Sequence, residues 1–104
     1  MMREGGPLAV IDVLDADKYS DFHLPGALNV ALSGNFEMEF LKVVPDRDTP
    51  VVVYCQDIDC DASHRAGRRL DQMGYLNVYD YQDGKADWRA AGFPIESKAA
   101  SEVT

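Results

Sequence analysis

The sequence has few basic residues, few cysteines and no long hydrophobic run, and each shortage excludes a class of protein. Ten lysines and arginines stand against eighteen aspartates and glutamates, which gives a net charge of -8. A nucleic-acid or anionic-membrane partner would require basic stripes that neutralise phosphates, so we expect neither partner. No apolar stretch reaches the ~18 residues that a membrane-spanning helix needs. The acidic surplus is typical of a solvated surface.

The two cysteines, Cys55 and Cys60, are too few for a disulfide framework. Residues 1–10 lack the pattern of a secretory signal, so we expect a cytoplasmic protein with reduced thiols. Two cysteines and two distant histidines are also too few for a zinc site, and no glycine-rich loop precedes a helix. The sequence therefore predicts neither a metal nor an organic cofactor.

Short β-branched runs alternate with helical patterns along the chain. Strands are predicted at residues 8–13, 27–32, 51–54 and 76–81, and helices at 15–21, 35–43, from Asp61 or Ser63 to Met73, and around Trp88. This alternation predicts an α/β fold, with a parallel sheet and helices on both faces.

The 104 residues suffice for one domain, which we place at residues 1–96, followed by a polar tail at 97–104. The first strand pattern begins almost at once, so we also expect that an N-terminal segment is missing.

Cys55 follows the strongest strand pattern and precedes a loop and a helix. Ligands of parallel sheets bind at the carboxyl ends of strands, which is where this thiol would lie. Loop N–H groups and the helix N-terminus would favour the thiolate, and the same N–H groups could hold a transferred sulfur atom as a persulfide. The alternative is structural, because a cysteine at a strand end is often a small buried hydrophobe.

Five motifs follow one another in a specific order. They are Val10–Val13, Tyr19 with His23–Ala27, Val51–Cys55, Gly74–Val78, and Gly84 with Trp88 and Ala91–Pro94. In this order they resemble the rhodanese homology domain of single-domain sulfurtransferases. The resemblance implies a rhodanese-like, five-stranded parallel sheet flanked by helices, with Cys55 as the sulfur acceptor. It also implies a small sulfur donor, or a protein that donates or accepts a persulfide, as the partner.

The loop after Cys55 departs from the Cys-x-x-Gly-x-Arg-Ser pattern that is usual in this family. Counted to Gly74 it is two residues longer, and it contains no glycine. The predicted active-site loop comprises Gln56, Asp57, Ile58, Asp59, Cys60, Asp61, Ala62 and Ser63, with Ala62 where the family has arginine. Its three aspartates oppose both an anionic substrate and a lowered thiol pKa, unless His64 or Arg65 turns into the pocket.

Three functions stay open at this point. The leading hypothesis is an enzyme, a sulfurtransferase or persulfide carrier that uses Cys55. The second is a catalytically weak binding or regulatory module, which the missing loop arginine favours. The third is a redox switch in which Cys60 is a resolving thiol for Cys55, and it requires the two Cα atoms to come within about 7 Å. His23 is expected to form structural hydrogen bonds. The sequence makes no prediction about the oligomeric state.

Overall fold

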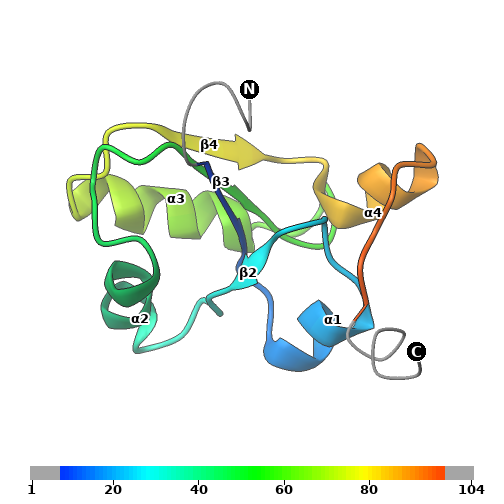
Figure 1. Cartoon of the computed structure of the whole chain (residues 1–104), viewed down its shortest axis with the longest axis horizontal. Coiled ribbons are helices and arrows are strands. Elements are labelled where there is room, and N and C mark those ends of the chain that lie inside the picture. The colour runs from blue at the N-terminus through cyan, green and yellow to red at the C-terminus, as the bar shows by residue number, and fades with distance from the viewer. Residues whose placement is uncertain (1–7, 98–104) are drawn as a thin grey trace.

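The computed structural model describes residues 8–97. Its four strands are β1 (Ala9–Asp12), β2 (Leu28–Asn29), β3 (Val51–Tyr54) and β4 (Val78–Tyr81), and its helices are α1 (Ala16–Asp21), α2 (Phe36–Val43), α3 (Ala62–Gln72) and α4 (Gly84–Ala90). All pairings are parallel, in the order β2-β1-β3-β4 (Figure 1). None of the helices in residues 8–97 is long and apolar enough to cross a bilayer.

The predicted α/β class with a parallel sheet is confirmed, whereas the predicted number of strands is wrong for the part of the chain that is described. The sheet there has four strands rather than five. The fifth strand came from the family resemblance alone, because the apolar patterns in the sequence mark only four. The tail at 98–104 lies outside the described residues, as does the opening segment, where we expected missing residues.

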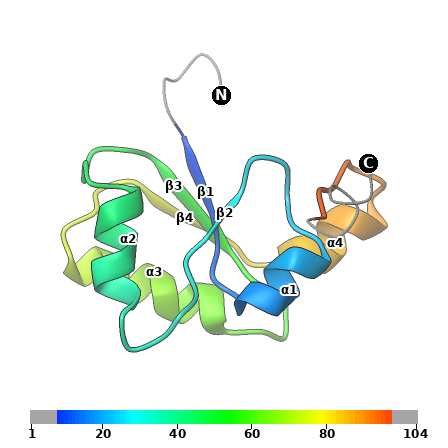
Figure 2. The same ribbon diagram turned by 60° about the horizontal axis from the view of Figure 1, so that its bottom comes forward.

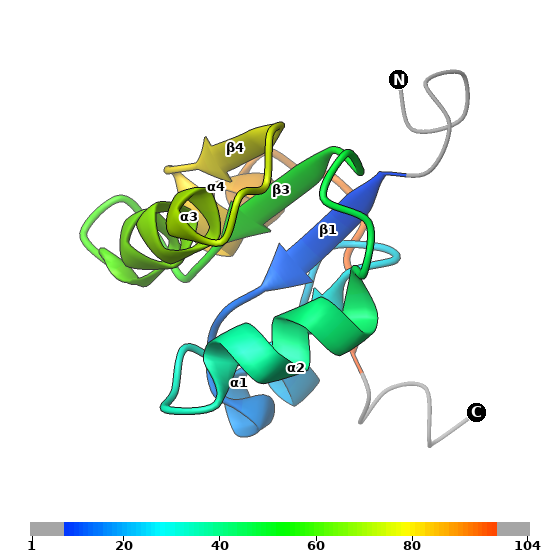
Figure 3. The same ribbon diagram turned by 90° about the vertical axis from the view of Figure 1, so that its left-hand side faces the viewer.

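Alternation along the strands divides the core between the two faces of the sheet. Ile11, Val51 and Val53 belong to the larger cluster, which also holds Phe36 and Phe40 of α2. Leu70 of α3 completes this layer. Figure 2 shows α2 and α3 together on one side of the strands, and Figure 3 shows α3 running beside β3 and β4.

The opposite face carries a smaller cluster around Val10, Leu24 and Tyr54. Tyr19 of α1 and Trp88 of α4 pack against it, and both helices lie away from α2 and α3 in Figure 2. The prediction of helices on both faces is therefore confirmed, although the two layers differ in size.

Several element boundaries differ from the predicted ones. The second strand is reduced to Leu28–Asn29. Beyond it, the N–H groups of Val30 and Leu32 still donate to the carbonyls of Asp12 and Val13, but these bonds lie outside the strand. The fourth strand begins at Val78 rather than at Leu76, whose side chain is exposed and whose N–H donates to the carbonyl of Arg47. The helix after the cysteine loop begins at Ala62, with Asp61 as its N-cap residue.

Candidate active site

Cys55 lies at the carboxyl end of β3, but its side chain is fully buried, with 0% exposure. Side chains alternate along β3, so Cys55 follows Val51 and Val53 onto the face covered by α2 and α3. The thiol thereby becomes part of the larger apolar cluster. The thiol that we predict to be reactive is therefore covered by core side chains in this structure.

The hydrogen bonds of the Cys55 thiol also differ from the predicted cradle of loop amides. The Sγ atom donates to the carbonyl oxygen of Cys60 at 3.2 Å and to the hydroxyl of Ser63 at 3.5 Å. Burial raises the pKa of the Cys55 thiol, and a hydrogen bond with the Cys60 side chain raises it further, while the hydroxyl and amide of Ser63 lower it. The raising effects prevail, so the closed site holds a neutral thiol, which is a poor nucleophile.

The loop that follows is a tight turn built around Asp57. The carbonyl of Asp57 accepts the N–H of Cys60 at 3.0 Å, and its carboxylate accepts the N–H of Asp59 at 3.1 Å. Ile58 at the tip of the turn is 62% exposed. The hydrogen bonds inside this turn are local, while Cys60 at its end packs against the larger core cluster and accepts the Cys55 thiol at its carbonyl.

The carboxyl end of the predicted loop is helical. Ala62 and Ser63, which we had assigned to the loop, form the first turn of α3. Asp61 precedes them and pairs with Arg65 at 3.3 Å, so the guanidinium of Arg65 is turned toward Asp61. Of the loop aspartates, two therefore shape the turn and the third pairs with the helix.

A cavity of about 270 Å³ opens beside the loop and is lined by Ile58, Cys60, Asp61, Ser63, His64 and Gln82. Cys60 is partly exposed and lies in the wall of this cavity, whereas Cys55 is not part of the lining. Ser63 connects the cavity with the buried Cys55, because it lines the cavity and its hydroxyl accepts a hydrogen bond from the Cys55 thiol. The structure thus brings Cys60 and His64 to one cavity and places Cys55 beneath it.

A larger cavity of about 490 Å³ runs along α3 and β4 and shares His64 with the first. The ring nitrogen Nδ1 of His64 lies 4.0 Å from a carboxylate oxygen of Asp80 in this cavity. Neither cysteine lines it. His64 therefore lies between the two cavities, and Arg65 lines neither of them.

The N-terminus of α4 is hydrogen-bonded to Cys55 and Gln56, where the loop begins. The N–H of Lys85 donates to the carbonyl of Cys55 at 3.0 Å, and that of Ala86 donates to the carbonyl of Gln56 at 2.9 Å. Gly84 makes this approach possible, since its φ is +74° and an added Cβ would lie 2.6 Å from the backbone carbon of Gln56. The sequence identified Gly84 only as part of a motif and did not reveal this contact.

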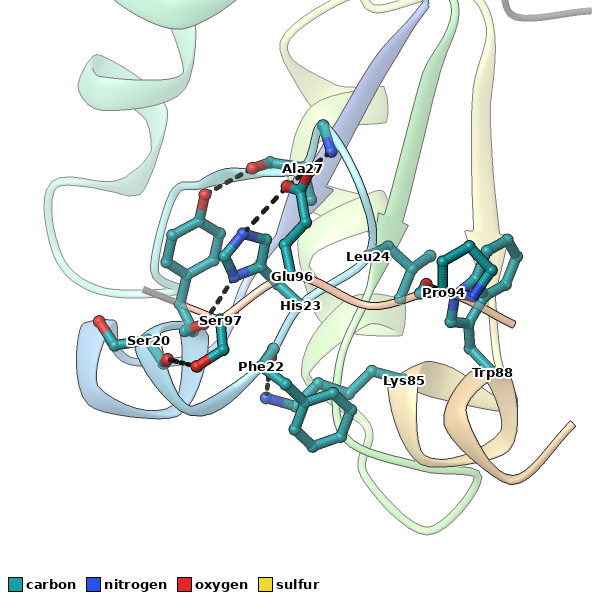
Figure 4. Close-up of polar contacts among 12 residues, drawn as sticks. Ser20, Phe22, His23, Leu24, Ala27, Lys85, Trp88, Pro94, Glu96 and Ser97 are labelled. Carbon is teal, nitrogen blue, oxygen red and sulfur yellow. Dashed lines mark hydrogen bonds and ion pairs between the residues drawn. The ribbon is translucent and has the colours of Figure 1, made fainter. Parts of the chain in front are cut away.

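Lys85 itself is fully buried, which nothing in the sequence indicated. Its Nζ atom donates to the carbonyl oxygen of Lys18 at 2.7 Å. It also donates to that of Phe22 at 2.7 Å and lies 4.3 Å from the centre of the Phe22 ring (Figure 4). Burial lowers the pKa of the Lys85 ammonium, and the buried carboxylate of Asp12 opposes this shift. The ammonium group therefore closes the space between α1 and α4.

His23 is part of the same polar region and acts as a structural residue there. Its Nδ1 atom lies 2.8 Å from the carbonyl of Tyr19, and its ring stacks on the Tyr19 ring at 3.9 Å. Its backbone pairs with that of Glu96, and its Nε2 atom lies 3.5 Å from the Glu96 carboxylate (Figure 4). These contacts join the turn after α1 to the last described residues.

Comparison with known proteins places this geometry in a family. The rhodanese-like domain matches residues 1–91. The chain belongs to the rhodanese-like domain family.

Three rhodanese-like relatives illustrate how this domain is used. The chain is 31% identical to the HTH-type transcriptional regulator Rv0324 of Mycobacterium tuberculosis, over 93% of this chain and 41% of the regulator. It is 26% identical to the thiosulfate sulfurtransferase GlpE of Coxiella burnetii, over 80% of this chain and 73% of that protein. The crystal structure of a thiosulfate sulfurtransferase from Pseudomonas aeruginosa superimposes with a TM-score of 0.77 at 37% identity, over 86% of this chain and 17% of that chain.

These relatives relate the rhodanese-like chain to sulfurtransferases at the level of the family. The chain spans less than half of the regulator and less than a fifth of the Pseudomonas enzyme. Regions similar to this chain thus occur both in proteins named as sulfurtransferases and within a protein named as a transcriptional regulator.

Proposed function

We propose that this protein is a sulfurtransferase or persulfide carrier in which Cys55 accepts the sulfur atom. The observation that carries the proposal is the position of Cys55, at the carboxyl end of β3 and directly before the turn that leads into α3, in a rhodanese-like chain. In the reaction, the thiolate of Cys55 attacks the outer sulfur of a donor. A new S–S bond forms, and the donor leaves with the electron pair of its broken bond to that sulfur.

The loop must open before this reaction, because the Cys55 thiol is buried and neutral in the closed site. Its two ends are fastened, one by the amides of Lys85 and Ala86 and the other by α3. Residues 57–60 are held by the local bonds of their own turn, so this segment is the part that can move. Opening would admit water and remove the burial that raises the thiol pKa.

The charges of the loop favour particular donors. Thiosulfate is an anion and requires a positive partner, but Ala62 occupies the usual arginine position and three aspartates lie nearby. We therefore propose a thiol persulfide, small or protein-bound, rather than thiosulfate as the preferred donor, and a nucleophilic small molecule or protein as the acceptor. The chemistry fits the cytoplasm, where thiols stay reduced.

Intact mass spectrometry tests the proposal. The reduced protein is incubated with thiosulfate and, separately, with glutathione persulfide, and the excess donor is removed. Cys60→Ser should gain one sulfur atom from the persulfide and much less from thiosulfate, while the double variant with Cys55→Ser should gain none. Sulfur uptake that survives in the double variant would disprove the role of Cys55.

A catalytically weak binding module is the second candidate, and the complete burial of Cys55 favours it. In such a protein the thiol would serve only as a small core residue under the loop. The same experiment separates the two functions, because a binding module would acquire no sulfur from any donor. The similarity to the regulator Rv0324 also supports a binding module, since the matching region there is part of a longer protein.

A further inference from the structure

The two cysteines of this chain lie against each other. The Cys55 Sγ atom is 3.2 Å from the carbonyl oxygen of Cys60. A carbonyl oxygen lies about 2.4 Å from the Cα of its own residue, so the Cys55 sulfur is within roughly 6 Å of the Cys60 Cα. The Cys60 side chain is also one of the causes of the raised pKa of Cys55. The sequence contains no third cysteine.

The two thiols differ in accessibility and in mobility. Cys55 is buried and fixed by β3, whereas Cys60 is partly exposed and lies on the turn whose bonds are local. A disulfide requires Cα atoms roughly 4.4–6.8 Å apart. Only four residues separate the cysteines, so closing this short ring costs little conformational entropy. The proposal below requires a movement of the turn that brings the Cys60 sulfur to that of Cys55.

The surroundings of Cys55 stabilise a persulfide anion only in part: the hydroxyl and amide of Ser63 favour a charged sulfur, whereas the other neighbours oppose it. The sulfur faces the carbonyl oxygen of Cys60, which repels negative charge, and the loop supplies no arginine. Asp57 and Asp59 add negative charge to the turn above it. A persulfide formed there is thus poorly stabilised, and an adjacent thiol reacts with it at a far higher effective concentration than any thiol in solution.

We propose that Cys60 resolves the Cys55 persulfide and releases its outer sulfur as hydrogen sulfide, an inference that rests on the proposed function. The Cys60 thiolate attacks the inner sulfur, which is the Sγ atom of Cys55. The bond from Sγ to the outer sulfur breaks, and the outer sulfur leaves with the electron pair as hydrosulfide. The persulfide is itself the oxidant: its outer sulfur is reduced by two electrons while the two cysteines become a disulfide. A cellular thiol or dithiol reductant then restores both thiols.

The test uses the whole chain, reduced and then freed of reductant, without oxygen. Glutathione persulfide is added and removed, and both the intact mass and the released sulfide are measured. The wild type should lose two hydrogen atoms and release the transferred sulfur as sulfide. Cys60→Ser and Cys60→Ala should instead retain one added sulfur atom and lose the sulfide release until an external thiol is added. A sample without donor should keep both thiols, which excludes oxidation by residual oxygen.

The outcomes separate this inference from the function on which it rests. A wild type that keeps the added sulfur and releases no sulfide would overturn the role of Cys60 and leave the sulfurtransferase proposal intact. If the two Cys60 variants acquire no sulfur although their circular dichroism and thermal midpoints match the wild type, both proposals fail. A disulfide that forms in the wild type without release of sulfide would also overturn the relay, since its electrons would have gone elsewhere.

Discussion

Lys85 and Cys55 are both fully buried near the carboxyl edge of the sheet, yet the structure holds them in opposite ways. The Lys85 ammonium donates two short hydrogen bonds to backbone carbonyls and lies over an aromatic ring. The Cys55 thiol has only two weak sulfur bonds, one of them to a turn that is held by local contacts.

This difference separates a fixed support from a movable site. Lys85 cannot leave its place without stranding buried carbonyl groups, which is costly. Cys55 can be uncovered when the turn above it moves, at the loss of weak bonds and a small apolar contact. The region around Lys85 therefore stabilises the floor of the site, and movement of the loop beside Cys55 is the step that our proposed reaction requires.

The largest effect is expected from Lys85→Met, which keeps most of the volume and removes the ammonium group. The Phe22 carbonyl loses its donor and the Lys18 carbonyl keeps only the long bond from the Phe22 N–H, so the free energy of unfolding should fall by about 2–4 kcal/mol. Urea unfolding followed by circular dichroism measures it. Lys42→Met, on the exposed surface of α2, is the control and should change the stability by less than about 0.5 kcal/mol. Equal losses for both variants would refute the supporting role of Lys85.

Gly84→Ala should cause a smaller loss in the free energy of unfolding. Gly84 lies between the region around Lys85 and the loop that follows Cys55. The new Cβ would lie 2.6 Å from the Gln56 backbone, in a backbone conformation with φ of +74° that alanine rarely adopts. We expect a loss of about 1–3 kcal/mol and faster alkylation of Cys55 by iodoacetamide, because the loop is pushed from its floor. Gly26→Ala is a matched control, since it has a similar φ of +76° but open space around its Cβ position. It should lose stability without exposing Cys55.

The pH dependence of Cys55 alkylation sharpens the comparison further. Burial raises the pKa of this thiol above its ordinary value of 9.0, so the thiolate fraction is small at neutral pH and grows as the pH rises. The alkylation rate should increase about tenfold per pH unit and continue to rise past the ordinary pKa. The measurement uses Cys60→Ala, in which Cys55 is the only thiol, and the same variant in urea as reference. A plateau at lower pH than in the unfolded chain would show the opposite shift.

The smallest effect is expected when the second thiol is removed. The Cys60 side chain is the second cause of the raised pKa of Cys55, after burial. Replacing it by alanine should therefore shift the alkylation profile of Cys55 to lower pH. The comparison is made with Cys60→Ser, whose hydroxyl can replace the thiol as a hydrogen-bonding group. Stability should change by less than about 1 kcal/mol in either variant, because Cys60 is only partly buried.

The sequence by itself determined the features that depend on local patterns. The β-branched run at Val51–Tyr54 became β3 with the predicted bounds, because such residues suit a strand buried on both faces. The alternation of strand and helix patterns predicted the parallel sheet, and it also placed Cys55 where a strand gives way to a loop. The ordered motifs were enough to indicate the family that the comparison confirmed.

Only the tertiary structure decided which side chains are buried near the site. Cys55 is covered because α2 and α3 pack over the face to which β3 turns it, and no local pattern around the cysteine specifies that packing. Lys85 is buried because α1, far away in the sequence, supplies the carbonyl groups that receive its ammonium. Both outcomes depend on contacts between residues distant in the chain, whereas sequence patterns report mainly on neighbours.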